Sequence, residues 1–185
     1  TGIWLLEGGT IASTARGSRT EIFAAAARRN EQFAGDSMWW FAHWITPAVL
    51  PVRFDTRFFA AVVPRGIEGV ADGNEVVDIA WISPADALSR ANAGAWSVAF
   101  PTRRTLADLG SFDATRALRN RLEARGPIEP VEPRLAAMQG DVRILLPGEP
   151  GFEAADPTVK DPRERAEIHR RLSTGGSTAS GVGRS

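Results

Sequence analysis

The alternating pattern of residues 53–64, RFDTRFFAAVVP, restricts the fold of this chain more than any other stretch. In an extended strand, successive side chains point to opposite faces, so every second residue shares a face. One face then carries Phe54, Thr56, Phe58, Ala60 and Val62. The opposite face begins with a charged group of three residues, Arg53, Asp55 and Arg57. The pattern predicts a β-strand with one apolar face and one charged face.

Two further runs favour strands, because both are rich in aromatic and β-branched residues. They are MWWFAHWI at 38–45 and EVVDIAWI at 75–82. The second run leads directly into SPADALSRANAG, which has the signals of a capped helix. Ser83 is a favourable N-cap, Pro84 suits the first helical position, and Gly94 suits the end of the helix.

Three more helices and a last strand complete the expected elements. Ser18 and Glu21 form a capping-box pattern ahead of a helix over EIFAAAARRNEQF. The segments at 102–110 and 113–126 are also expected to be helical, and DVRILLPG is expected to be a strand. The opening Gly2–Leu6 is interpreted as a helix end or a short strand. This mixture indicates an α/β or α+β domain built from layers of sheet and helix.

Composition excludes several kinds of site and partner. The chain has no cysteine, so it has no disulfide, no thiolate zinc site and no cysteine nucleophile. Its 22 basic and 22 acidic residues balance, so we expect no nucleic-acid partner. No apolar run approaches the roughly 20 residues that span a bilayer, and the opening residues lack the basic flank of a signal peptide. We therefore expect no membrane partner and a cytoplasmic location.

The charged group on the strand has two interpretations. Asp55 lies between Arg53 and Arg57 on one face, which is typical of a cross-strand ion-pair network. The same arrangement also suits a patch that binds and orients an anionic substrate. Glu75, with Asp72 beside a glycine-containing loop, either contributes to a metal site or is a solvated acid of a turn.

The histidines and tryptophans favour structural roles. His43 lies among strand aromatics, which is typical of a packed or hydrogen-bonded core histidine. His169 is expected to be an exposed side chain without a special role. The tryptophans favour packing in a core or an interface over stacking on a nucleotide base; they are Trp39, Trp40 and Trp44.

Three segments, in order, resemble one branch of the Nudix hydrolases. They are WITPAVLPVRFDTRFFAAVVP at 44–64, NEVVDIAWISPADAL at 74–88 and FPTRRTLADL at 100–109. The branch includes the peroxisomal coenzyme A diphosphatases and their bacterial relatives. The first segment is similar to the one that follows the family's catalytic helix, the second to a late strand and its helix, and the third to a Pro-Thr-x-x-Thr-Leu segment. DVRILLPGEP is similar to a C-terminal strand of the same family.

The resemblance implies a mixed β-sheet sandwiched between helices. It implies a hydrolase that cleaves a diphosphate linkage in a coenzyme A or nucleoside diphosphate derivative. In this family, carboxylates on one helix hold Mg²⁺ or Mn²⁺, which assists the attack of water. The implied partner is a small-molecule nucleotide or coenzyme A derivative. We expect Arg53, Asp55, Arg57 and Glu75 to bind the substrate.

Two alternatives to an active hydrolase stay open. One is a catalytically inactive Nudix-like domain that binds a nucleotide ligand or a protein partner. The other is a stand-alone interaction domain whose similarity to the family is accidental. Turnover of a diphosphate compound distinguishes the first interpretation from both alternatives.

The family signature, G-x5-E-x7-R-E-U-x-E-E-x-G-U with U a bulky apolar residue, is not found within the 185 residues. Its last three positions match Thr1, Gly2 and Ile3, where glycine would end the metal-binding helix in a left-handed turn. We therefore expect the catalytic glutamates and metal ligands upstream of Thr1, and the fragment alone to be inactive and poorly folded. The expected division is the C-terminal portion of a Nudix domain at 1–147, an extension at 148–172 and a disordered tail at 173–185.

Overall fold

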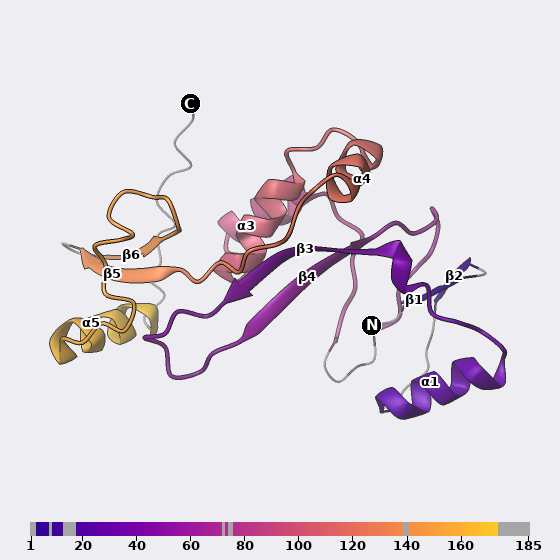
Figure 1. The fold of residues 1–185 in the computed structure, drawn as a ribbon, viewed down its shortest axis with the longest axis horizontal. Helices are drawn as coiled ribbons and strands as arrows, with labels where there is room; N and C mark the ends of the chain where they lie inside the picture. The colour runs from indigo at the N-terminus through magenta and orange to yellow at the C-terminus, as the bar shows by residue number, and fades with distance from the viewer. Residues whose placement is uncertain are drawn as a thin grey trace. The chain divides into compact units, whose positions relative to one another are not determined.

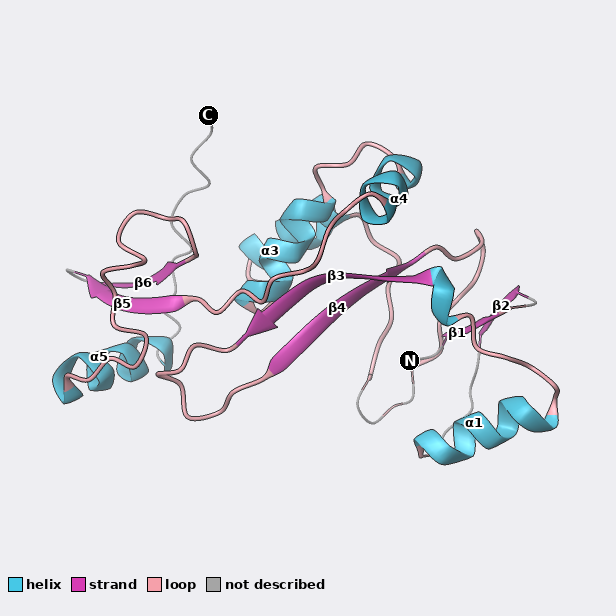
Figure 2. Ribbon diagram, in the orientation of Figure 1, coloured by secondary structure: helices cyan, strands magenta, loops and turns pink. Residues whose placement is uncertain are grey.

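The computed structural model describes residues 3–7, 9–12, 18–71, 73, 76–138 and 141–173 of the 185-residue chain. Within these residues the chain is a mixed α/β protein, with five α-helices and three two-stranded sheets (Figures 1 and 2). The mixed α/β class predicted from the sequence is thereby confirmed. The chain divides into two compact units, which are Thr1–Phe41 with Phe59–Gly126 and Ala42–Phe58 with Pro127–Ser185.

The first unit begins with a hairpin and a helix. β1 (Ile3–Leu6) pairs antiparallel with β2 (Gly9–Ala12). α1 (Arg19–Arg28) starts at the predicted capping box. The Glu21 N–H donates to Ser18 Oγ at 3.4 Å, and the Ser18 N–H donates to Glu21 Oε2 at 2.6 Å. Both exposed donors at the start of the helix are thus satisfied by side chains.

A small apolar cluster joins the hairpin to α1. Leu6 and Ala26 are buried, and three partly buried side chains pack against them, namely Ile22, Ala25 and Phe33. Phe33 also contacts Phe23 edge to face, with 5.1 Å between the ring centroids. The helix ends at Arg28, earlier than the predicted end at Phe33, and Asn30 follows with a positive φ of 52°. Asparagine tolerates this left-handed conformation better than most residues, so the chain turns there.

Three further helices of the first unit lie where the sequence predicts them. They are α2 (Pro84–Asn92), α3 (Phe100–Leu109) and α4 (Thr115–Glu123). Ser83 caps α2, because its Oγ accepts the N–H of Asp86 at 3.1 Å. α2 packs against α3, and the buried side chains on the two helices are Ala87, Ala91 and Thr105.

Both central strands are also confirmed. β3 (Met38–Ile45), which follows the short 3-10 helix η1 (Gly35–Ser37), pairs with β4 (Asp55–Ala61). The two strands run in opposite directions (Figure 1). Thr46 closes the connection between them: its N–H donates to Phe54 O at 3.0 Å, and its Oγ1 accepts the Phe54 N–H at 2.9 Å. This closure fixes where β4 begins relative to the end of β3.

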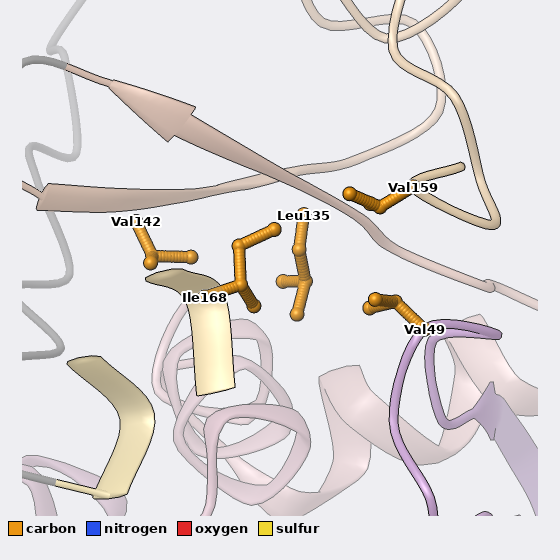
Figure 3. Close-up of a cluster of buried hydrophobic side chains, with 5 residues drawn as sticks. All are labelled: Val49, Leu135, Val142, Val159 and Ile168. Atoms are coloured by element: carbon orange, nitrogen blue, oxygen red, sulfur yellow. The ribbon is translucent and has the colours of Figure 1, made fainter. Parts of the chain in front are cut away.

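The second unit is organised by a hairpin that packs on a helix. β5 (Arg134–Met138) pairs antiparallel with β6 (Asp141–Leu145), and α5 (Pro162–Ser173) packs against both strands. Their apolar side chains meet in one cluster, with Ile168 of α5 fully buried at its centre (Figure 3). The members of this cluster are Val49, Leu135, Val142, Val159 and Ile168.

The loop before α5 is held in an unfavourable backbone conformation. Val159 is buried and has a φ of 46°, a region that a β-branched residue rarely adopts. The guanidinium of Arg165 binds its carbonyl oxygen, from Nε at 3.1 Å and from Nη2 at 2.9 Å. The first turns of α5 therefore fix the loop that places Val159 in the core.

Some elements differ from the expectations. Residues 76–82 form no strand, although EVVDIAWI has the composition of one, and residues 77–82 make no backbone–backbone hydrogen bond with another described segment. The sequence pattern does not predict β5 or α5 either. α5 includes Ser173, the first residue of the predicted tail, and residues 174–185 lie outside the described residues.

Candidate functional site

Asp55, at the start of β4, receives two hydrogen bonds on one oxygen. Nε2 of His43, on β3, lies 2.6 Å from Oδ1 of Asp55, and Nη1 of Arg57 donates to the same oxygen at 3.1 Å. His43 is only 8% exposed, whereas the side chains of Asp55 and Arg57 are 54% and 46% exposed. A buried imidazole and a half-exposed guanidinium thus hold the same carboxylate. We name these three residues the Asp55 cluster.

Arg53 turns to other partners. Its Nε donates to the carbonyl oxygen of Thr46 at 2.9 Å, and its Nη2 donates to Oε1 of Glu132 at 2.6 Å. In the structure Arg57 therefore pairs with Asp55, whereas Arg53 pairs with Glu132. The three charges of the predicted patch do not form a single group.

Glu132 reaches Arg53 because the residue before it is attached to β3. The Val131 N–H donates to His43 O at 2.8 Å, and the Ile45 N–H donates to Val131 O at 2.9 Å. These two bonds form a parallel bridge between Val131 and Trp44. Glu132 is not predictable as a partner of Arg53, since the two residues are 79 apart in the chain and no local pattern marks the contact.

The group of the Asp55 cluster that can donate to an anion is the guanidinium of Arg57, since Asp55 is itself an anion. Guanidinium groups form short, charge-assisted hydrogen bonds with phosphate or carboxylate oxygens. Asp55 fixes the orientation of Arg57, and part of the Arg57 side chain faces solvent. His43 in turn fixes Asp55 from the buried side of the strand pair. His43 is therefore a hydrogen-bonded core histidine, as its surroundings in the sequence indicate, and it also supports an exposed charged group.

Several predicted positions cannot be placed beside this cluster. Glu75 and Asp72 lie outside the described residues, as do Thr1 and Gly2. Ile3 is the first residue of β1, in the first unit. The side chain of His169 is also outside the described part of the structure.

The tryptophan side chains of β3 are buried or half-buried rather than fully exposed to solvent. Trp44 is buried, and Trp39 and Trp40 are half-buried. The guanidinium carbon of Arg119, on α4, lies 5.5 Å from the centroid of the Trp39 ring, within reach of a cation–π contact. This arrangement fits the packing role expected for these side chains.

No metal site is present among the described residues. No group of three or more His, Asp or Glu side chains in this part of the chain is placed to hold a metal ion. The described residues therefore do not fit the Mg²⁺ or Mn²⁺ that the resemblance implies. Nor does any helix formed by these residues have the length and apolar character needed to cross a membrane.

A pocket of about 410 Å³ lies elsewhere in the second unit, between the β5–β6 hairpin and residues 150–156. Its charged lining residues are Arg143, Asp156 and Glu164. The carboxylate of Asp156 accepts hydrogen bonds from the hydroxyl and the N–H of Thr158, and these bonds lower the pKa of Asp156 below its ordinary value. Since Asp156 is used by its own turn and the lining charges are mixed, the pocket indicates no particular ligand.

Comparisons with known proteins assign no family to this chain. Models of protein families, curated proteins and solved structures were all compared with this chain, and none of them matches it. The functional interpretation therefore rests on the residues themselves.

Proposed function

We propose that this chain belongs to a Nudix-type hydrolase that cleaves a diphosphate linkage in a coenzyme A or nucleoside diphosphate derivative. The observation that carries the proposal is the Asp55 cluster, which lies inside the RFDTRFF segment. That segment is part of the first of three ordered stretches resembling the coenzyme A diphosphatase branch. An oriented, half-exposed arginine is the kind of group that a diphosphate substrate requires.

In this proposal Arg57 is the substrate-binding residue. Its guanidinium donates to anionic oxygens of the diphosphate, while Asp55 and His43 hold it in place. Binding would withdraw part of the diphosphate charge, which otherwise repels an attacking water or hydroxide. Asp55 therefore acts as a positioning residue and is not itself expected to touch the reacting phosphorus.

Arg53 has a different role in the proposal. Its two hydrogen bonds connect the end of β3, the start of β4 and the segment containing Glu132. This network keeps Arg57 at a defined position on the strand. Arg53 is thus a structural support of the site and contributes little direct contact with substrate.

The proposal assigns the metal-dependent part of the chemistry to residues other than those described. In a Nudix-type hydrolase a divalent cation supplies charge neutralisation and an activated water. In the same proposal the strands of this chain belong to a mixed sheet sandwiched between helices.

The test uses the full-length gene product and a panel of coenzyme A and nucleoside diphosphate compounds. We expect release of a nucleoside monophosphate or phosphopantetheine that depends on Mg²⁺ or Mn²⁺. The variant Arg57→Ala should bind the substrate less tightly, whereas the control Arg163→Ala, which removes an exposed arginine of α5, should not. Binding without turnover would instead support the inactive Nudix-like domain, and neither binding nor turnover would reject both interpretations.

A further inference from the structure

One oxygen of the Asp55 carboxylate remains available as an acceptor. Oδ1 receives the hydrogen bonds from His43 and Arg57, at 2.6 and 3.1 Å. Among the residues that the structure describes, none donates a hydrogen bond to Oδ2. The Asp55 side chain is half-exposed, so a ligand can reach the carboxylate from solvent.

The two hydrogen bonds on Oδ1 fix the orientation of the carboxylate. An ionised carboxylate only accepts hydrogen bonds, so His43 donates from Nε2–H and Arg57 donates from Nη1–H. The three residues belong to the second unit, where they lie on the neighbouring strands β3 and β4 (Figure 1). Because the imidazole is buried, its position is well defined. Oδ2 is therefore an oriented acceptor close to the guanidinium of Arg57.

The opposite charges of Arg57 and Asp55 suit different parts of one ligand. A guanidinium binds anionic oxygens, whereas a carboxylate accepts from O–H or N–H groups and repels a second anion. A ligand whose phosphate is bound by Arg57 therefore needs a hydrogen-bond donor in the part that lies beside Asp55. In a nucleoside diphosphate or a coenzyme A derivative, the ribose hydroxyls lie close to the diphosphate and meet this need. Inorganic pyrophosphate has no sugar to supply such a donor.

We propose that Oδ2 of Asp55 accepts a hydrogen bond from a ribose hydroxyl of the substrate while Arg57 binds the neighbouring diphosphate. Asp55 is then a specificity-determining residue as well as a support for Arg57. Its contact is with the sugar and not with the reacting phosphorus. This inference rests on the proposed function, since it concerns the same site and the same class of substrate.

Calorimetric binding of two matched ligands to the full-length gene product tests the inference. The ligands are the α,β-methylene analogues of ADP and of 2′,3′-dideoxy-ADP, which are not hydrolysed at the P–C–P linkage and differ only in the ribose hydroxyls. We expect the wild type to bind the ADP analogue about tenfold more tightly, because a hydrogen bond to a charged group contributes about this factor.

Asp55→Asn should bind the two analogues with nearly equal affinity. Both neighbours of the Oδ1 position are donors, so the side-chain oxygen of asparagine takes that position and its NH₂ group replaces Oδ2. The acceptor for the hydroxyl is thereby lost. The readout is a ratio between two ligands that carry the same diphosphate analogue, so a shift of Arg57 in this variant affects both ligands alike.

Two other variants serve as controls. Glu132→Gln makes the same acid-to-amide change in the network of Arg53 and should keep the preference for the ADP analogue. Arg57→Ala should weaken the binding of both analogues but keep the preference, because His43 still holds Asp55.

The outcomes separate this inference from the proposed function. If the wild type binds both analogues equally, the inference is wrong and the proposed function stands. A preference that persists in Asp55→Asn also overturns the inference, because another residue must then contact the ribose. If neither analogue binds the wild type, both the proposed function and the inference are rejected. The wild-type comparison needs no variant, so it holds even where a substitution disturbs folding.

Discussion

His43 and Asp55, twelve residues apart, are joined across β3 and β4 by a hydrogen bond of 2.6 Å between Nε2 and Oδ1. The imidazole is buried while the carboxylate is half exposed, so the bond connects a buried side chain of β3 to an exposed charged side chain of β4. It is one of two contacts that fix Asp55, the other being the bond from Arg57. The consequences can be measured as coupling energies.

A double-mutant cycle with His43→Ala and Asp55→Ala should give a coupling energy of about 1 to 2 kcal/mol in the free energy of unfolding. Hydrogen bonds to charged groups stabilise by about this amount when one partner is buried. The parallel cycle with Asp55→Ala and Arg57→Ala should give about 0.5 kcal/mol or less, because both of those side chains are about half exposed to solvent. Chemical denaturation measures both values. Equal coupling energies in the two cycles would contradict the prediction that the His43–Asp55 bond contributes more than the Asp55–Arg57 bond.

Arg53 and Arg57 should respond differently to truncation. Arg53→Ala removes bonds to Thr46 and Glu132 and should lower the free energy of unfolding by about 1 kcal/mol. Arg57→Ala should change stability by less than about 0.5 kcal/mol but weaken binding of a diphosphate ligand by about 1.5 to 3 kcal/mol. Thermal unfolding and calorimetric binding on both variants separate the two effects. If Arg57→Ala binds the ligand as tightly as the wild type, Arg57 does not contact substrate.

Ile168 should be the most sensitive position of the second unit. It is fully buried between α5 and the β5–β6 hairpin, so Ile168→Ala leaves a cavity and should cost about 2 to 5 kcal/mol. Arg163→Ala, on an exposed part of the same helix, should change stability by less than about 0.5 kcal/mol. Denaturant unfolding of the two variants makes the comparison. Similar midpoints for both would mean that α5 is not anchored through Ile168.

The capping box of α1 predicts a dependence of stability on pH. Hydrogen bonds from Ser18 lower the pKa of Glu21 below its ordinary value of 4.5. The unfolded chain therefore binds the Glu21 proton more readily than the folded chain does. The contribution of Glu21 is complete above pH 4.5 and is lost as the pH falls through the lowered folded-state value.

Glu21→Gln removes the titrating carboxylate and therefore tests whether the capping contact lowers the pKa of Glu21. Glutamine can still accept the Ser18 N–H, so the helix should form, but its stability should no longer decline through this group at acidic pH. Denaturation of wild type and variant at neutral and at acidic pH should show a stability difference that shrinks on acidification. A difference that grows instead would show that the capping contact does not lower the pKa of Glu21.

Local signals in the sequence were sufficient for much of the fold. The caps at Ser18 and Ser83 mark the starts of α1 and α2, because a side-chain oxygen bonds a donor two or three residues ahead. The alternation at 53–64 predicts β4, since period two belongs to strands alone. These features depend on residues close in the chain.

Features that depend on distant residues were not predictable in the same way. Residues 77–82 have strand composition, but a strand also needs a neighbouring strand, and no described segment makes backbone hydrogen bonds with them. β5, RLAAM, is short and carries alanines, which do not favour strands. Half of the residues of α5 are charged, and its packing depends on contacts between Ile168 and residues far away in the chain.

In the candidate site, too, contacts between nearby residues were predictable and contacts between distant residues were not. The sequence places Asp55 and Arg57 on one face of a strand, and the structure joins them. It does not reveal that Arg53 turns to Glu132, because that contact requires Val131 to bridge β3. Nor does it reveal that His43 faces Asp55, since the pairing of β3 with β4 depends on how Thr46 closes the connection.

The most direct test of the central claim is an assay of the full-length gene product for hydrolysis of coenzyme A and nucleoside diphosphate compounds. We expect metal-dependent cleavage at the diphosphate, with a nucleoside monophosphate or phosphopantetheine among the products, and a raised KM for Arg57→Ala but not for Arg163→Ala. Absence of turnover with every compound, in the presence of Mg²⁺ and of Mn²⁺, would contradict the proposal that this chain belongs to a diphosphate hydrolase.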